Sequence, residues 1–339
     1  MEIDCIHFYV VDATRTRDLL VQQMGLRYLG GKINEHTIEY LVGNYHLLFS
    51  IASPLNSASP VADYLQLHPS GVRNISFRVP DLDEMRRKID RLGIEILAVS
   101  SEADEFPWLT VRGWGSIDHT IIQASSELTD STITLDESIT GIDHLVLNVA
   151  VGELEPAALW YRDLFDFQVH QTFDIHTQKS GLTSQALVSA CGKIRFNINQ
   201  PSSSNSQIQQ FLNTNRGAGI QHIALQTHDI FTTIDRMQQQ KLAFLPIDRT
   251  YYTQLQIRAK TAQQQSLTDD EWQKLQRLQV LMDWTESAPE ALLLQIFTQP
   301  IFESPTFFFE VIERRNLAKG FGQGNFQSLF EAIEQYNSI

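Results

Sequence analysis

The sequence predicts an α+β protein made of two tandem domains, and two observations support this prediction. The chain has 339 residues, which is long enough for two domains that each bury a core. Four strand–helix–strand patterns occur along it in two pairs, and the second pair resembles the first. Internal repetition of this kind is the mark of a repeated structural unit. The sequence therefore indicates a duplicated domain.

The first domain is expected to span residues 1–126. Its opening unit reads as strand, helix and strand between Ile3 and Leu29. Its second unit repeats this order between Gly71 and Leu97. Asp81 precedes the second helical pattern, where its carboxylate can cap the unpaired N–H groups of the first turn.

The second domain is expected to span residues 139–339. Its first unit runs from Ile142 to Val169, and its second opens with a strand at 219–227. Asp229 is placed to cap the following helix, as Asp81 does in the first domain. A strand at 242–245 is expected to close this second unit.

Three segments have no place in the repeat. Residues 127–138 are polar and without pattern, which is typical of a linker. Residues 250–284 have no evident counterpart in the first domain; within them Thr268, with Glu271 three residues later, predicts a helix start. The tail has a glycine-rich turn and then a predicted helix, and spacing alone leaves open whether this helix only completes the core. Its apolar positions recur at helical spacing: Phe326, Leu329, Phe330 and Ile333.

Composition excludes several classes of function. The formal net charge of −14 disfavours nucleic acid and anionic membrane surfaces as partners. No apolar run approaches the roughly 20 residues that span a bilayer, and the first residues lack the pattern of a signal peptide. The two cysteines, Cys5 and Cys191, do not form a disulfide framework. A cytoplasmic protein is therefore expected.

A carboxylate in an apolar strand is the first sign of a functional site. Glu310 lies within Phe307-Phe-Phe-Glu-Val-Ile312, which is typical of a short strand. Because side chains alternate along a strand, Phe308, Glu310 and Ile312 are expected to share one face. A buried carboxylate is costly unless it is paired, and a metal ion is one such partner.

Two histidines stand at matched positions of the second domain. His144 and His222 each lie in the opening strand of a repeat unit, where the first domain has Cys5 and Asn74. A single strand histidine is more often a core residue than a metal ligand, but matched positions together with Glu310 reverse that expectation. Two histidines and a carboxylate are the facial triad of non-haem Fe(II) oxygenases. The first domain lacks this set and is expected to hold no metal.

The second half of the chain resembles the 4-hydroxyphenylpyruvate dioxygenase family of the vicinal-oxygen-chelate superfamily. The resemblance covers about residues 142–333, and the short chain with Arg195-Phe-Asn-Ile-Asn199 is similar to the cyanobacterial form. It implies two vicinal-oxygen-chelate domains of paired βαβββ units, each an open β-barrel, with a C-terminal lid helix. The matching pieces are Ile142-Asp-His-Leu145, Ser180-Gly-Leu-Thr-Ser184, Ser206-Gln-Ile-Gln-Gln-Phe-Leu212, Gly217-Ala-Gly-Ile-Gln-His222, Tyr251-Tyr252, Leu292-Leu-Leu-Gln-Ile-Phe297, Phe309-Glu-Val-Ile-Glu-Arg314 and Gly320-Phe-Gly-Gln-Gly-Asn-Phe326.

The resemblance also implies roles for particular residues. His144, His222 and Glu310 match the ligands of one Fe(II) per chain. Asn197 departs from the family, where many members have proline. The remaining site residues fall into three groups: polar pocket residues Gln221, Gln295, Asn199, Ser184 and Gln207; aromatic walls Phe297, Phe308 and Phe326; and lid residues Asn325, Leu329 and Phe330.

The implied reaction is the conversion of 4-hydroxyphenylpyruvate and O₂ to homogentisate and CO₂. It combines oxidative decarboxylation, ring hydroxylation and a 1,2 shift of the side chain. Two alternatives stay open: 4-hydroxymandelate synthase, which hydroxylates the benzylic carbon of the same substrate, and a metal-free binding protein of the same fold. Phe326 favours the dioxygenase, since a smaller lid residue is expected in the synthase. The sequence does not decide whether the chain forms a homo-oligomer or which amide holds the phenol. It also does not decide whether the product enters tyrosine catabolism or tocopherol biosynthesis.

Overall fold

A computed structural model gives the architecture of the chain. It describes residues 1–101, 104–124, 138–176, 180–262, 264 and 266–336, without the side chains of residues 176, 323, 327, 330, 331 and 334–336. The linker predicted at 127–138 therefore lies outside the described residues except for Ser138. Within the described residues, no helix is both long and apolar enough to span a membrane.

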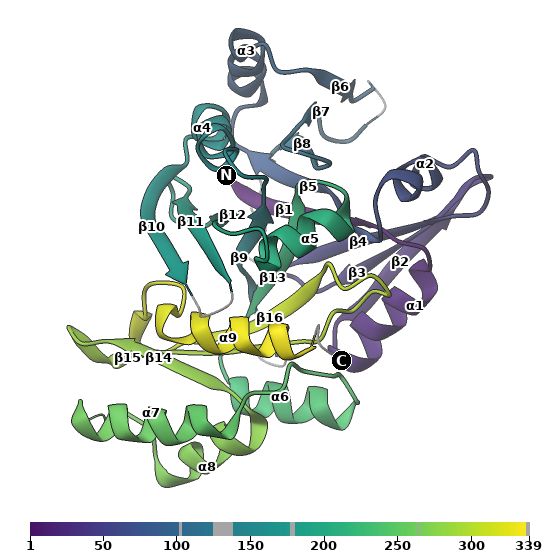
Figure 1. Cartoon of the computed structure of the whole chain (residues 1–339). Helices are drawn as coiled ribbons and strands as arrows, with labels where there is room; N and C mark the ends of the chain where they lie inside the picture. The colour runs from purple at the N-terminus through teal and green to yellow at the C-terminus, as the bar shows by residue number, and fades with distance from the viewer. Residues whose placement is uncertain (102–103, 125–137, 177–179, 263, 265, 337–339) are drawn as a thin grey trace.

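Two eight-stranded sheets with the same strand order make up the molecule, one for each half of the chain (Figure 1). The first sheet has the order β2-β3-β4-β1-β5-β8-β7-β6, and the second β10-β11-β12-β9-β13-β16-β15-β14. The strands of the first are β1 (Glu2–Tyr9), β2 (Arg27–Ile33), β3 (Thr37–Gly43), β4 (Leu48–Pro54), β5 (Gly71–Val79), β6 (Ile96–Val99), β7 (Trp108–Arg112) and β8 (Asp118–Gln123). Those of the second are β9 (Gly141–Asn148), β10 (Gln168–His176), β11 (Gly181–Val188), β12 (Arg195–Pro201), β13 (Gly219–Gln226), β14 (Leu281–Thr285), β15 (Ala288–Phe297) and β16 (Phe308–Arg314).

Each sheet is built from two βαβββ units that meet at their opening strands. In the first half β1 pairs antiparallel with β5, and in the second half β9 pairs antiparallel with β13. Each opening strand also pairs in parallel with the last strand of its own unit, as β1 does with β4. The predicted α+β fold of two tandem duplicated domains is confirmed.

The helices cover the sheets and the ends of the strands. Those in the first half are α1 (Ala13–Asp18), the π-helical η1 (Leu19–Gln23), α2 (Pro60–Leu67) and α3 (Leu82–Leu92). Those in the second half are α4 (Leu154–Phe165), α5 (Gln207–Asn215), α6 (Ile230–Gln239), α7 (Arg249–Thr261), α8 (Asp269–Leu278), the 3₁₀ turn η2 (Arg315–Leu317) and α9 (Gln323–Tyr336). In Figure 1 α9 lies in front of the second sheet, and it packs against β14, α5 and β10.

The predicted helix caps are present. The carboxylates of Asp81 and Asp229 accept hydrogen bonds from the third residue of α3 and α6, at 2.8 and 3.1 Å. Thr268 and Glu271 form the reciprocal capping box that starts α8. These local signals were readable because each cap depends only on residues within one turn.

The strand predicted at 242–245 is wrong. This segment forms only one isolated bridge, between Phe244 and Thr298. Pro246 follows it, and a proline has no N–H with which to continue a ladder. The strand that matches β6 is instead β14, which occupies the same place in the sheet order. The insertion without a counterpart therefore ends before β14, because β14 belongs to the repeat.

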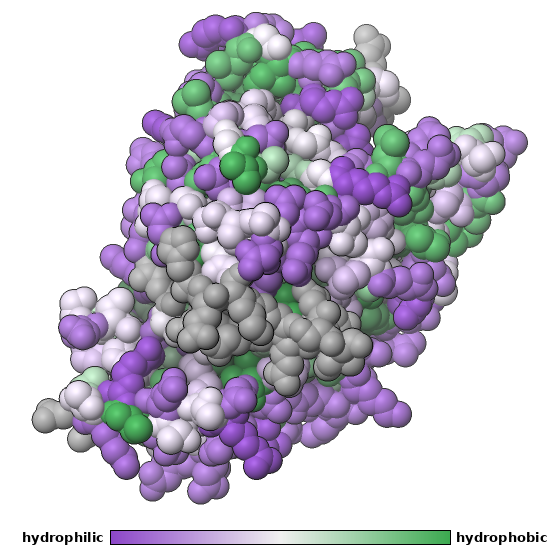
Figure 2. All heavy atoms as spheres, viewed as in Figure 1, coloured by the Kyte–Doolittle hydropathy of each residue, from purple (hydrophilic) through white to green (hydrophobic). Residues whose placement is uncertain are grey.

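One hydrophobic core runs through both halves. At their junction His119 of β8 is fully buried, and its Nε2 lies 3.1 Å from the hydroxyl of Tyr161 in α4. Phe77, Trp160 and Phe165 surround the same imidazole. On the outside, the face in Figure 2 is mostly hydrophilic or neutral, with hydrophobic residues in small separate groups.

Burial lowers the pKa of His119 to about 3, partly offset by its contact with the carbonyl of Ile75. Because the folded pKa lies below the ordinary value, protonation favours unfolding. The stability that neutral His119 contributes to the fold is complete above about pH 6.5, the ordinary pKa of histidine. This contribution is lost as the pH falls toward 3.

We therefore expect the metal-free protein to lose about 2 kcal/mol more stability between pH 7.5 and pH 5 than the variant His119→Gln. Glutamine can keep a hydrogen bond to Tyr161 but does not titrate. Urea unfolding at the two pH values measures the difference. Equal losses in the two proteins would show that His119 does not control this pH dependence.

Candidate active site

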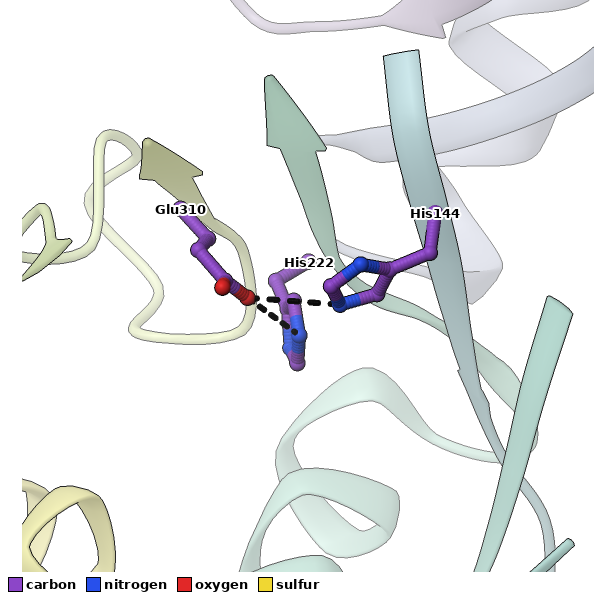
Figure 3. Close-up of side chains that lie close together, drawn as sticks. All are labelled: His144, His222 and Glu310. Atoms are coloured by element: carbon purple, nitrogen blue, oxygen red, sulfur yellow. Dashed lines mark ion pairs between the residues drawn. The ribbon is translucent and has the colours of Figure 1, made fainter. Parts of the chain in front are cut away.

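Three adjacent strands of the second sheet carry the predicted ligands. The order β9-β13-β16 places His144, His222 and Glu310 on neighbouring strands. In the register, Ala224 of β13 lies between His144 and Glu310, and His222 pairs with Phe308, two residues before Glu310. Figure 3 shows that the three side chains point toward one another. The matched positions in the repeat thus bring the two histidines and the acid together.

The three side chains form a compact buried group. Nε2 of His144 lies 3.3 Å and Nε2 of His222 lies 3.6 Å from Oε2 of Glu310 (Figure 3). One donor atom from each residue falls within 4.8 Å of the others. Among the described residues, no other group of three or more histidines, cysteines and acids meets the same criterion. The geometry suits a single metal ion bound by two nitrogens and one oxygen.

The surroundings of the two imidazoles fit a metal at this point. Nδ1 of His144 lies 2.9 Å from Oδ1 of Asp143, which leaves Nε2 to face Glu310. Nδ1 of His222 is buried and has no hydrogen-bond partner among the described residues. Nε2 of His222 faces Glu310, and Phe308 stacks on the same ring, so Nε2 is the nitrogen placed to bind a metal. Two imidazoles and a carboxylate are also the donor set of mononuclear non-haem iron sites.

Electrostatics within the group favour a bound cation. Burial alone lowers the pKa of His144, but attraction to Glu310 and the hydrogen bond to Asp143 outweigh it and raise this pKa to about 9. Burial, and then the charge of His144, lower the pKa of His222 well below its ordinary value. Burial would raise the pKa of Asp143, but hydrogen bonds from Arg314 and His144 hold it well below the usual range. The site thus keeps positive charge beside Glu310 even without a metal.

Two β-bulges place neighbouring residues on the same face. The register between β9 and β13 passes from His144↔Ala224 to Ile142↔Leu225, so Asp143 is the extra residue. It passes from Ile220↔Leu147 to His222↔Val146, so Gln221 is also an extra residue. A bulge re-aims side chains that strict alternation would send to opposite faces. This allows Asp143 to reach His144, and Gln221 to line the same pocket as His222.

A pocket opens from the three ligands, and most of the predicted site residues line it. Beside the ligands, the predicted residues in its lining are Ser184, Asn199, Gln207, Gln221, Gln295, Phe297, Phe326 and Leu329. Asn197 lines it as well, and its buried Oδ1 has no hydrogen-bond partner within the described chain. The free space left between the side chains is about 50 Å³. This is room for a few water molecules.

Three predicted residues do not line this pocket. Phe308 instead stacks on the imidazole of His222, with ring centroids 4.8 Å apart. It therefore packs against the ring of a predicted metal ligand, and its role as a wall of the pocket stays a prediction. Asn325 is 1% exposed and faces Gln295 and Tyr251. The side chain of Phe330 lies outside the described residues.

A chain of amides links Glu310 to α9. Nε2 of Gln295 donates to Oε1 of Glu310 at 3.2 Å, and Nδ2 of Asn325 donates to Oε1 of Gln295 at 3.1 Å. The hydroxyl of Tyr251 in turn donates to Oδ1 of Asn325 at 2.8 Å. Gly322 allows this close approach, since a Cβ there would lie 1.8 Å from Oε1 of Gln295. The amide of Gln295 therefore orients a ligand and anchors the helix above it.

Sequence reasoning missed residues that hold the site in place. Asp143 and Arg314 occur in the matching pieces, but neither was assigned a role. Strand alternation predicts that Asp143 points away from His144, and the bulge is not visible in the sequence. Phe321 was also missed: its ring lies 5.4 Å from that of His144, edge to face. The glycines on either side of Phe321 were the available signal, because they mark a tight turn.

The first sheet places other side chains at the equivalent positions. Its register aligns Cys5 and Asn74 with the two histidines, as predicted, and Thr120 with Glu310. Nδ2 of Asn74 donates to Oγ1 of Thr120 at 2.7 Å. A thiol, an amide and a hydroxyl thus replace the nitrogen and oxygen ligands. That the first domain holds no metal remains a prediction.

Comparison with known proteins agrees with this architecture. Residues 141–270 match the model of the Glyoxalase/Bleomycin resistance protein/Dioxygenase superfamily. The chain is 39% identical to an uncharacterized protein of Synechocystis, over 98% of this chain and 97% of that protein. It is 31% identical to a 4-hydroxyphenylpyruvate dioxygenase of Dictyostelium discoideum, with the same coverage. It is 32% identical to one from Sus scrofa, over 98% of this chain and 91% of that protein.

Solved structures share the whole fold. A triple mutant of 4-hydroxymandelate synthase from Streptomyces coelicolor superposes with a TM-score of 0.85 and 25% identity, over 99% of this chain and 98% of that one. A fusion protein of a xylose isomerase-like TIM barrel and a 4-hydroxyphenylpyruvate dioxygenase superposes with a TM-score of 0.77 over 52% of its length. At 24% identity, this second likeness shows the fold alone.

We expect Fe(II), added under argon, to raise the unfolding temperature of the protein. At a concentration 100 times the dissociation constant, binding contributes about 2.7 kcal/mol. Glu310→Gln should abolish most of this gain, because it removes the anionic ligand. Glu313→Gln is the matched control, since Glu313 is a buried acid of the same strand that bonds instead to Ile230 and Arg315. Equal Fe(II)-dependent shifts in wild type and Glu310→Gln would contradict the assignment.

Proposed function

The chain belongs to the 4-hydroxyphenylpyruvate dioxygenase family, and from this premise we propose that it is an Fe(II)-dependent dioxygenase. Its reaction converts 4-hydroxyphenylpyruvate and O₂ to homogentisate and CO₂. The observation that carries the proposal is the buried set of His144, His222 and Glu310 at the base of a pocket lined by amides and aromatic rings. A metal-free binding protein would have no need of three converging ligands that are each costly to bury.

The protein contributes binding, orientation and exclusion of water. His144, His222 and Glu310 would hold one Fe(II). When bound, Fe(II) would supply the activation of O₂ that oxidative decarboxylation and ring hydroxylation require. Asp143 keeps Nδ1 of His144 occupied, so that Nε2 is the nitrogen available to bind the metal. Gln295 holds one oxygen of Glu310 and leaves Oε2 facing the two histidines.

Apolar side chains keep water from the reacting atoms and hold an aromatic ring. Phe321 and Phe326 pack with Phe173 over the pocket. Phe297 also lines the pocket and packs against His222 and Phe308. A dry, enclosed site strengthens the polar contacts within it and limits side reactions.

Amides and a hydroxyl provide the polar contacts of the substrate. Ser184 and Asn199 face each other across β11 and β12, and both line the pocket. Gln207 and Gln221 line it from α5 and β13. We assign these groups to the phenol end of the substrate, since the carboxylate and keto oxygens are the natural partners of the cation.

The choice between two products depends on how the ring is held. The likeness to 4-hydroxymandelate synthase favours that activity as the second candidate. In the dioxygenase reaction, the oxidising group must face the ring carbon that bears the side chain. In the 4-hydroxymandelate synthase reaction, it must face the benzylic carbon. Phe326 reaches the pocket from α9 and packs edge to face on Phe173. A large, well-packed ring at this position favours a fixed ring orientation and therefore homogentisate.

The function is tested by supplying Fe(II), 4-hydroxyphenylpyruvate and O₂ to the purified protein. We expect one O₂ consumed and one CO₂ released for each homogentisate, as identified by chromatography and mass spectrometry. 4-Hydroxymandelate as the sole product would establish the second candidate instead. No substrate-dependent O₂ uptake by iron-loaded protein would rule out both.

Phe326→Ile should divert turnover to 4-hydroxymandelate, because a smaller side chain lets the ring turn. Since small misplacements of a reacting group cost large factors in rate, we expect homogentisate formation to fall about tenfold or more. Phe302→Ile is the control, because Phe302 packs against Phe8 and Phe307 outside the pocket. A Phe326→Ile variant that makes homogentisate alone at the wild-type rate would show that this ring does not position the substrate.

A further inference from the structure

Arg314 connects the metal-binding strands to the segment that leads into α9. Its side chain is 7% exposed and lies at the end of β16, four residues after Glu310. Nε and Nη2 donate to the two carboxylate oxygens of Asp143, at 2.6 and 2.7 Å. Nη1 donates to the backbone carbonyls of Ala318 and Gly320, at 3.1 and 2.8 Å. One guanidinium thus holds a buried acid on one side and the backbone on the other.

The acid held by Arg314 is the same one that orients His144. Oδ1 of Asp143 accepts from Nη2 of Arg314 and lies 2.9 Å from Nδ1 of His144. Because Asp143 is held as a carboxylate, the imidazole must donate from Nδ1. Nε2 then remains directed at Glu310, at 3.3 Å. Any displacement of Arg314 would therefore loosen the carboxylate that holds the imidazole of His144 in its orientation.

The backbone held by Arg314 also touches the site. Phe321 follows Gly320 and packs edge to face on the imidazole of His144. Gly320 and Gly322 have φ of 85° and 73°, the left-handed conformation that glycine adopts without strain. The turn thus places Phe321 over His144, while Arg314 secures the carbonyl of the residue before it.

A second connection joins α9 to the other end of the ligand set. Asn325 donates to Gln295, and Gln295 donates to Glu310. The segment 318–329 is therefore bound to His144 through Asp143 and Arg314, and to Glu310 through Gln295. Because two separate hydrogen-bonded paths join them, the position of the segment depends on the orientation of the ligands. The orientation of the ligands likewise depends on the position of the segment.

We propose that Asp143 and Arg314 are positioning residues that couple metal binding at His144 to closure of segment 318–329 over the pocket. The inference rests on the proposed metal site. Coupling of this kind is reciprocal: if the metal orders the segment, then loosening the segment weakens the metal. An enzyme built in this way closes its pocket fully only when the metal is in place.

Hydrogen exchange of the wild-type protein gives the first test. Fe(II) under argon should slow exchange of amides in the peptides that cover 318–329 by about tenfold or more, relative to the metal-free protein. Peptides from α2 and α3 of the first domain serve as the internal reference and should not change. Equal exchange of segment 318–329 with and without Fe(II) would overturn the proposal without any variant.

Variants then separate the two contacts of Arg314. Arg314→Gln should weaken Fe(II) binding about tenfold or more, as losing a partner of a ligand does, and should abolish the Fe(II)-dependent protection. Arg314→Lys keeps a charge for Asp143 but cannot also hold two carbonyls. It should therefore lose most of the protection and weaken Fe(II) binding less than Arg314→Gln does, a difference that general destabilisation would not produce.

Arg195→Gln is the matched control. Its guanidinium also approaches Asp143, at 3.4 Å, but its side chain is 35% exposed and forms no hydrogen bond to the described residues of segment 318–329. Affinity and protection should both remain at the wild-type level. Wild-type affinity and protection in Arg314→Gln would overturn the proposal; if that variant does not fold, Arg314→Lys and the wild-type exchange experiment decide.

The same preparations distinguish this inference from the proposed function. If the wild-type protein binds Fe(II) and forms homogentisate while both Arg314 variants behave like it, only the coupling is wrong. If the wild-type protein binds no Fe(II), the proposed function fails and the coupling fails with it.

Discussion

The carboxylate of Glu310 is the group on which the rest of the site depends. It is 2% exposed, and its partners among the described residues are His144, His222 and Gln295. A charge buried in this way is tolerated only beside a compensating charge. Without a metal that charge is a proton on His144, whose pKa is raised to about 9 by Glu310 and Asp143 against the effect of burial. A divalent cation at the same point would satisfy all three ligands together.

The duplicated fold explains how such a group arises. Pairing of β9 with β13 brings the two equivalent positions onto neighbouring strands, and β16 adds a third beside them. The first sheet has the same geometry but carries Cys5, Asn74 and Thr120 there. One scaffold thus carries a thiol, an amide and a hydroxyl in one half and a candidate metal centre in the other. The core that runs across both halves, with His119 against Tyr161, keeps the two sheets together.

Sequence patterns were sufficient where the cause is local or periodic. Asp81, Asp229 and Thr268 cap helices as predicted. The repeat pointed to the two histidines, and the apolar strand around it pointed to Glu310. The strand at 242–245 failed because Pro246 ends any ladder there and β14, far along the chain, takes the place in the sheet. The roles of Asp143 and Arg314 could not be predicted, since Asp143 depends on a bulge and Arg314 on a partner 171 residues away along the chain. Long-range register is the information that periodicity does not contain.

The central claim is that His144, His222 and Glu310 together bind one iron. Anomalous diffraction at the iron edge, from crystals of protein loaded with Fe(II) under argon, tests it most directly. The account predicts one anomalous peak in the second domain, about 2.0–2.2 Å from Nε2 of each histidine and from a carboxylate oxygen of Glu310. A peak bound elsewhere, or one from which any of these three side chains points away, would contradict it.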